Sequence, residues 1–327
     1  MRADDSGPPA NVSTVGRRNA RVPELVRLED RISFLYLERC VINRAGNALT
    51  ATTVEGVVHI PMAAVSCVLV GPGASVTHAA MALMADSAST MVWVGEAGVR
   101  YYAHGQGLST RTALLERQAA VVSHQRRRLD LARRMYGRRF PGEDVTRASM
   151  QQLRGREGAR VRRLYREEAA RTGVPWTGRS YDPNDFAGGD PVNRSLSAAN
   201  HALYGVVHAA VVAMGCSPHL GVVHTGHTQS FVHDLADLYK AEFTIPLAFD
   251  VAADADPDDE VEGLVRRRFR DLQKDGNLLS RCARDLKDLL MPGEELDDPV
   301  LGGQVIYLWD ENQEPVAGGR LQDVVPW

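Results

Sequence analysis

The chain has 327 residues, a mass of 35.8 kDa, 44% hydrophobic and 24% charged residues, and a formal net charge of −3. These proportions are those of soluble globular proteins, and they exclude a chain that is mostly disordered, collagen-like or embedded in a membrane. The length predicts two domains with a sizeable core. The four scattered cysteines have no CxxC spacing, which argues against a zinc site and a disulfide framework and favours the reducing cytoplasm.

The first third of the chain is expected to form strands. It begins with a polar segment, residues 1–22, which we expect to be a loose tail because it lacks the apolar run of a signal peptide. A helix is expected at 78–86, with Thr77 as its N-cap. β-branched and aromatic runs predict strands at 31–42, 48–54, 57–60, 64–70, 91–94 and 99–102. These strands predict a small N-terminal β domain over residues 23–104.

After a predicted hinge at 105–110, the hydrophobic pattern changes to the three- and four-residue spacing of helices. This pattern predicts that residues 111–290 form a larger, mainly α-helical catalytic domain. Together with the β domain, it predicts an α+β fold for the whole chain. The expected helices are 109–136, 149–171, 195–214, 231–243, 260–274 and 278–290. The apolar stretch 202–214 is too short to span a bilayer and is expected to be a buried helix. Residues 291–327 are expected to be an appended tail, in which the apolar run 304–309 suggests a hairpin.

The near-neutral net charge hides a strong asymmetry. Residues 111–180 contain 18 arginines, no lysine and seven acidic residues, which leaves the rest of the chain strongly acidic. A basic middle on an acidic protein predicts a face for a polyanion such as nucleic acid. The alternative is a bias in composition, because the chain has 35 arginines and only three lysines.

Several acidic residues and one histidine stand where chemistry is possible. Glu157 occupies the stripe of a predicted helix where the core face should run, although an arginine neighbour or solvent would also account for it. His224 ends an apolar run before Thr225 and Gly226, a position that also suits a hydrogen-bonded core histidine. Asp234 and Asp237 lie three residues apart, hence on one helical face. Alternatively, Asp234 is only a negative charge near the N-terminus of a helix, where the helix dipole stabilises it.

Glu157, His224 and Asp237 form a set of one imidazole and two carboxylates from three separate segments. Such mixed oxygen and nitrogen ligation suits Mg²⁺ or Mn²⁺, and the histidine favours Mn²⁺ more than an all-oxygen site would. No spacing of a Ser/His/Asp or Cys/His triad accompanies these residues. The sequence alone leaves open whether the three side chains meet.

Five ordered blocks of the chain resemble the CRISPR-associated integrase family, the spacer-acquisition subunit of CRISPR systems. The blocks are LRGREGARVR at 153–162, YDPND at 181–185, LYG at 203–205, GVVHTG at 221–226 and FVHDLAD at 231–237. The further block WVGEAGVR at 93–100 resembles the subtype I-E branch. The similarity covers residues 28–290 and leaves both ends of the chain outside it.

The resemblance implies a metal-dependent DNA endonuclease and integrase that transfers the 3′-hydroxyl ends of captured DNA into a CRISPR repeat. It implies Mg²⁺ or Mn²⁺ held by Glu157, His224 and Asp237, with Asp234 as an auxiliary catalytic residue and Tyr204 beside the reacting end. Tyr204 also suits a core position. A homodimer is implied, which assembles with a small ferredoxin-fold adaptation subunit into a heterohexamer. The arginines that the resemblance implies as DNA contacts are Arg100, Arg154, Arg160 and Arg162.

Two positions depart from the family pattern. His227 stands where relatives often carry a basic residue after the Thr-Gly pair, and Arg39 stands near the position where close relatives place an aromatic residue that wedges the fork of the incoming DNA. Two other functions stay open from the sequence. One is a metal-dependent nuclease that acts on branched DNA in repair, and the other is a non-catalytic DNA-binding scaffold.

Overall fold

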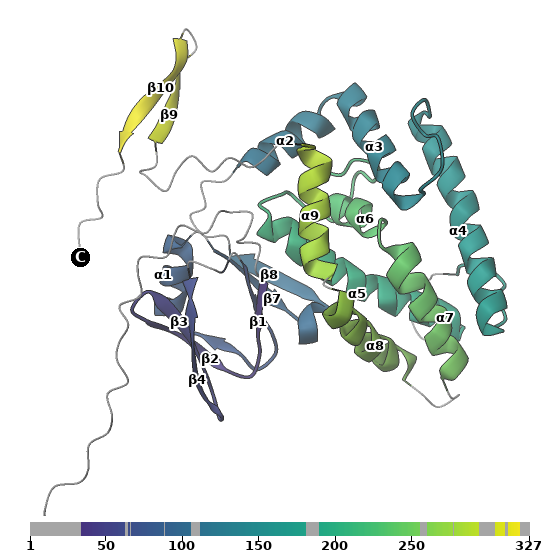
Figure 1. The fold of residues 1–327 in the computed structure, drawn as a ribbon, viewed down its shortest axis with the longest axis horizontal. Coiled ribbons are helices and arrows are strands. Elements are labelled where there is room, and N and C mark those ends of the chain that lie inside the picture. Colours follow the sequence, from purple (N-terminus) through teal and green to yellow (C-terminus); the bar gives the residue numbers. More distant parts are fainter. Residues whose placement is uncertain are drawn as a thin grey trace, which may run out of the picture.

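The computed structural model of the protein describes residues 34–62, 65, 67–87, 89–105, 112–180, 190–255, 260–276, 278–293, 305–310 and 313–320. Strands come first along the chain and helices follow, so that a β region lies beside a helical region (Figure 1). The predicted α+β class is therefore confirmed. The predicted tail at 1–22, nearly all of the predicted hinge and the YDPND block lie outside the described residues.

The N-terminal region is built from two four-stranded sheets. The first has the order β1-β5-β7-β8, in which β8 is antiparallel to β7 and the other pairings are parallel. The second has the order β4-β3-β2-β6. The strands are β1 (Phe34–Leu37), β2 (Val41–Ala45), β3 (Ala48–Thr53), β4 (Gly56–Pro61), β5 (Cys67–Val70), β6 (Ser75–Val76), β7 (Thr90–Val94) and β8 (Tyr101–Gly105).

Helix α1 (His78–Asp86) packs against β2, β3 and β7 and shares their core. Its bounds are those predicted, and the Thr77 hydroxyl accepts the N–H of Ala80, as expected of an N-cap. The 3₁₀ turn η3 (Glu96–Gly98) then leads from β7 into β8.

The predicted strand at 31–42 is wrong as a single element. Arg39 adopts a left-handed backbone, with φ of 50°, between β1 and β2. Its N–H donates to the carbonyl of Pro72 at 3.0 Å, which fixes the turn. The turn sends β1 and β2 into different sheets, an outcome that a continuous run of strand-forming residues does not reveal.

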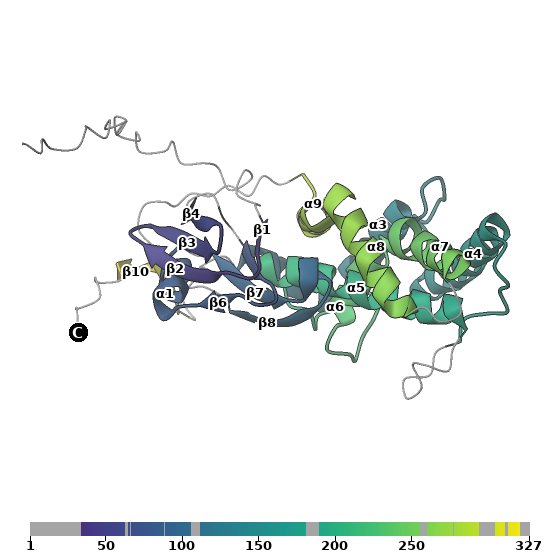
Figure 2. The same cartoon turned by 90° about the horizontal axis from the view of Figure 1, so that it is seen from below.

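The helical region is arranged around α5 (Pro191–Ala213), which contacts α6, α7, α8 and α9 as well as β7 and β8 (Figures 1 and 2). Among the described residues, α5 alone is long and apolar enough to cross a membrane, but 72% of its most apolar window is buried, as in a core helix. The others are α2 (Ala113–Val122), α3 (Gln125–Arg139), α4 (Met150–Thr172), α6 (Ser230–Ala236), the π-helical η4 (Lys240–Thr244), α7 (Ile245–Asp254), α8 (Val261–Gly276) and α9 (Leu278–Leu290).

Three helix predictions differ from the structure. The predicted helix 109–136 breaks into α2 and α3 because His124 is extended and its ring accepts the N–H of Arg127 as a new N-cap. Helix α5 starts four residues before the prediction, with Asp190 as N-cap and Pro191 in the first turn. The predicted helix 231–243 ends early, and α7, which follows the π turn, was missed.

Of the apolar run predicted at 304–309, residues 305–309 belong to a strand, and residue 304 lies outside the described residues. Strand β9 (Val305–Asp310) pairs antiparallel with β10 (Gln313–Arg320) and forms the hairpin drawn in yellow in Figure 1. This bears out the hairpin suggested by the sequence.

Candidate active site

His224 lies on the loop between α5 and α6, and Asp234 on α6 holds that loop. The Asp234 carboxylate accepts the backbone N–H groups of Val222, Val223 and His224, the last two at 3.0 and 2.8 Å. It also accepts from Nδ1 of His224 at 2.8 Å. Asp234 is only 3% exposed, so its carboxylate has lost most of its hydrating water. These hydrogen-bond donors compensate for that loss.

The contact with Asp234 determines how the imidazole is presented. A carboxylate only accepts hydrogen bonds, so Nδ1 carries the proton and Nε2 is left for another partner. The hydrogen bond to Asp234 raises the pKa of His224; burial opposes this, and the charges of Asp237 and Asp234 add to it. Asp234 therefore acts through His224 and is a positioning residue.

The carbonyl side of the same loop is held by arginines. Arg128 on α3 donates from Nε to the carbonyl of Val222 at 2.6 Å. Arg154 on α4 donates to the carbonyl of Val223 at 2.6 Å. Further back, the fully buried Gln118 donates to the carbonyls of Ser217 and Leu220 at 2.8 and 3.0 Å. Sequence reasoning missed Arg128 and Gln118, because nothing local marks a contact with a loop about 100 residues away.

The two candidate carboxylates converge on Arg139, which lies at the end of α3. Its Nη1 forms ion pairs with Glu157 of α4 and, at 3.5 Å, with Asp237 just after α6. The other oxygen of Glu157 accepts from the Tyr136 hydroxyl at 2.5 Å. The Arg139 side chain is only 7% exposed, and within the described residues its Nε has no hydrogen-bond partner. A buried cation therefore joins two carboxylates from distant segments.

Lys240 adds a second cation beside Asp237. Its ammonium lies 2.6 Å from the Asp237 carboxylate and 5.0 Å from the centroid of the Tyr204 ring. Burial raises the pKa of Asp237, but the positive charges of Lys240, Arg139 and His224 outweigh it, so the pKa lies below its ordinary value. The Tyr204 ring also lies 4.7 Å from the ring of His233. Tyr204 thus stands at the edge of this cluster.

The donor set fits a small divalent cation, but the structure does not arrange it as a ligand cluster. In the part of the chain that is described, no three His, Cys, Asp or Glu side chains are grouped to hold a metal ion. Instead, the Arg139 guanidinium forms ion pairs with both carboxylates. Two carboxylates that gather buried cations, with an imidazole whose Nδ1 is already anchored, have the charge and donor types that Mg²⁺ or Mn²⁺ requires.

The four arginines expected to contact DNA have different surroundings. Arg100 and Arg162 are exposed. Arg160 forms an ion pair with Glu143, and its guanidinium lies 4.4 Å from the Phe140 ring centroid. Arg154 holds the Val223 carbonyl, as described above. Their contacts with DNA stay predictions.

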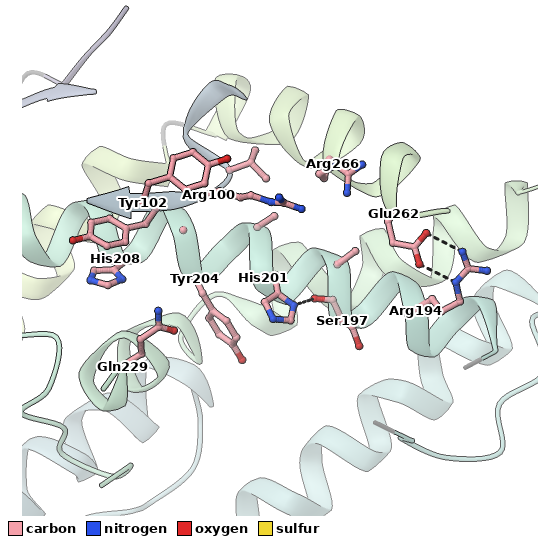
Figure 3. A pocket seen from close by; sticks show the side chains of 15 residues that line it. Arg100, Tyr102, Arg194, Ser197, His201, Tyr204, His208, Gln229, Glu262 and Arg266 are labelled. Carbon is pink, nitrogen blue, oxygen red and sulfur yellow. Dashed lines mark hydrogen bonds and ion pairs between the residues drawn. The ribbon is translucent and has the colours of Figure 1, made fainter. Parts of the chain in front are cut away.

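A cavity of about 370 Å³ opens beside the cluster and shares Tyr204 with it. Figure 3 shows Arg100 extending along α5 toward Arg266 in this cavity. Arg194 is paired with Glu262 through two contacts of 2.8 Å, whereas for Arg100 the described residues supply no carboxylate partner. The 61% exposed ring of Tyr102 forms part of the lining. The cavity thus combines an aromatic surface with a cation available to an anionic ligand.

Sequence comparison relates the chain to one family. The family model "CRISPR associated protein Cas1" matches residues 34–142 and 142–256. The "CRISPR-associated endonuclease Cas1" of Clostridium sp. (strain SY8519) is 46% identical over 293 residues, which cover 90% of this chain and 96% of the relative. The protein with the same name from Escherichia coli (strain K12) is 40% identical over 272 residues, covering 82% and 88% respectively.

Solved structures agree with this assignment. The chain resembles the TtCas1 of a crystal structure of a TtCas1–DNA complex, with a TM-score of 0.76, 42% identity, and coverage of 81% of this chain and 98% of that one. A casposase bound to its integration product matches with a TM-score of 0.59 and 13% identity, covering 81% and 98% of the two chains. At that identity, the second match shows a shared fold alone.

Proposed function

Because the chain belongs to the Cas1 family of CRISPR-associated proteins, we propose that it is an integrase that joins captured DNA to a CRISPR repeat. One observation carries the proposal: Glu157 and Asp237 both form ion pairs with Arg139, and the Asp237 charge acts on the His224 imidazole that Asp234 orients. Relatives named CRISPR-associated endonucleases support phosphodiester chemistry at this place. The WVGEAGVR block, which resembles the subtype I-E branch, supports an assignment to that subtype.

The proposed reaction is a transesterification. The oxygen of a DNA 3′-hydroxyl forms a new bond to the phosphorus of a phosphodiester in the repeat, the existing phosphorus–oxygen bond of the repeat strand breaks, and that strand leaves with a free hydroxyl. Glu157, His224 and Asp237 would hold Mg²⁺ or Mn²⁺, which lowers the pKa of the attacking hydroxyl and stabilises charge on the phosphate oxygens. In-line phosphoryl transfer depends on positioning and electrostatics, so no covalent protein nucleophile is needed. Asp234 orients His224, and Arg139 and Lys240 place positive charge beside the carboxylates.

The cavity next to Tyr204 is the proposed path of the single-stranded end. Aromatic rings stack on bases of any sequence, and a neighbouring cation contacts the phosphate backbone. Tyr102 and Arg100 supply these two groups, and Tyr204 connects the cavity to Lys240 and Asp237. Arg160 and Arg162 on α4 are proposed to contact duplex backbone. The TtCas1–DNA complex supports binding of DNA by this fold.

The proposed assembly is a homodimer, two copies of which flank a dimer of a small ferredoxin-fold adaptation subunit. The support for this proposal is membership of the family.

An integration assay on a supercoiled plasmid that carries a CRISPR repeat tests the proposed function. A labelled DNA fragment with free 3′-hydroxyl ends is incubated with the protein, the adaptation subunit and Mn²⁺. Covalent joining of the label to the repeat is expected, and it should disappear with EDTA or with a 3′-dideoxy end. Cleavage of branched DNA without joining would favour a repair nuclease, and DNA binding without either product would favour a scaffold.

A further inference from the structure

The peptide that carries His224 is held from both sides. On its N–H side, Asp234 accepts from Val222, Val223 and His224. On its carbonyl side, Arg128 reaches across from α3 and donates Nε–H to Val222 at 2.6 Å. Both polar groups of Val222 are thus bonded to charged side chains, two residues before the imidazole.

We propose that Arg128 is a positioning residue for His224. Hydrogen bonds to charged groups are shorter and stronger than those between neutral groups. With Asp234 and Arg128 on opposite sides of Val222, rotation of the peptide breaks a charge-assisted bond in either direction. Because the loop has no helix or strand of its own around His224, these contacts set where the imidazole stands.

The alternative is that Arg128 belongs to the DNA-binding surface, as its place in the arginine-rich middle of the chain suggests. Its location distinguishes it from its neighbours, because it is half-buried whereas Arg126 and Arg127 on the same turn are exposed. The Nε–H of Arg128 donates to the protein's own backbone, so this donor is not free to bind a phosphate. The two roles predict different results.

This inference rests on the proposed function for its catalytic consequence, but not for its structural one. The experiment compares Arg128→Met, which keeps the length and removes the donor, with Arg128→Lys, which restores a cation. Arg127→Met is the matched control on the same helix. Amide hydrogen exchange of Val222, Val223 and His224 is measured in the metal-free protein, and strand-transfer kinetics and DNA binding are measured against salt concentration.

Arg128→Met is expected to speed exchange of these three amides at least tenfold while leaving the α5 amides unchanged. It should lower kcat by about 10- to 100-fold, the usual loss when a group behind a ligand is removed, and leave KM for DNA within twofold. Arg128→Lys should recover part of kcat. Arg127→Met should change neither the exchange of the three amides nor kcat.

Unchanged exchange in both Arg128 variants would overturn the proposal. So would a salt slope of DNA affinity that falls by about 0.9, since that is the signature of one lost phosphate contact. If the wild-type protein joins no DNA, the proposed function fails, whereas the exchange data still decide whether Arg128 positions the loop.

Discussion

Asp234 binds His224 twice, because one oxygen of its carboxylate accepts both the backbone N–H and Nδ1–H of that residue, each at 2.8 Å. The peptide and the ring of His224 are therefore oriented by the same buried group. Ten residues separate the two along the chain, and the first turns of α6 bring them together. Through these two contacts, Asp234 belongs to the candidate site by orienting His224.

Asp234→Asn should weaken both metal binding and folding. The amide keeps the shape but offers one acceptor in place of two, and its NH₂ faces backbone donors that are already bonded to the wild-type carboxylate. We expect Mn²⁺ affinity to fall about 10- to 100-fold and the free energy of unfolding to fall by about 1–3 kcal/mol. Calorimetric Mn²⁺ titration and urea denaturation measure the two effects. Wild-type Mn²⁺ affinity would contradict the positioning role.

Gly205 is required where α5 crosses the turn before β8. A Cβ there would lie 2.6 Å from the Val99 carbonyl oxygen and 2.9 Å from Cα of Arg100, both of which are backbone atoms. Gly205→Ala should therefore lower the free energy of unfolding by about 1–3 kcal/mol. Gly155→Ala in α4 is the control, because a Cβ there meets nothing within 4 Å and should raise stability by up to about 1 kcal/mol. If the free energy of unfolding changed in the same direction in both variants, the close contact at Gly205 would not be what makes glycine necessary there.

His208 should make the fold sensitive to acid. Burial, with the nearby His104 and His219, lowers the pKa of His208 to about 4, whereas an unfolded histidine has a pKa near 6.5. Between these values the unfolded chain binds the proton and the folded chain does not, so stability falls as the pH drops from about 6.5 toward 4.

His208→Phe should remove this loss, because a phenyl ring can stack on Tyr101 and carries no unpartnered Nδ1. The drop in Tm between pH 7.5 and 4.5 is expected to be smaller than in the wild type. His59→Gln, at an exposed position on β4, serves as the control and should keep the wild-type drop. An equal drop in the His208 variant would show that other groups govern acid stability.

Arg100→Ala should reduce affinity for single-stranded DNA and flatten its salt dependence. One lost phosphate contact on a single strand lowers the salt slope by about 0.7. Filter binding of an oligonucleotide at several salt concentrations measures this, with the distant, exposed Arg44→Ala as a control. If the two variants behave alike, the cavity beside Tyr204 is not the path of the strand.

Local signals in the sequence predicted much of the fold. The Thr77 cap gave the start of α1 correctly, and the predicted helix 149–171 differs from α4 by one residue at each end. Helix α7 was missed because Pro246 near its start suggests a break, although proline is tolerated in a first turn. Nothing in the sequence indicated that Arg39 adopts a left-handed backbone and ends β1, because this conformation depends on contacts with the turn at 72–73.

The candidate site was only partly predictable. Glu157, His224 and Asp237 stood out by residue type and family resemblance, and the structure brings the two carboxylates together. Arg139, which joins them, is one of 18 arginines in a segment where composition does not distinguish any single one. Arg128 and Gln118 meet the His224 loop only through the tertiary fold.

We propose that Glu157, His224 and Asp237 share one divalent cation. Anomalous diffraction from crystals soaked in Mn²⁺ measures this directly. We expect a single strong peak within bonding distance of both carboxylates and the His224 imidazole, with the Arg139 guanidinium moved away from Glu157 and Asp237. A peak elsewhere, or Arg139 still bridging the two carboxylates at saturating Mn²⁺, would contradict this proposal.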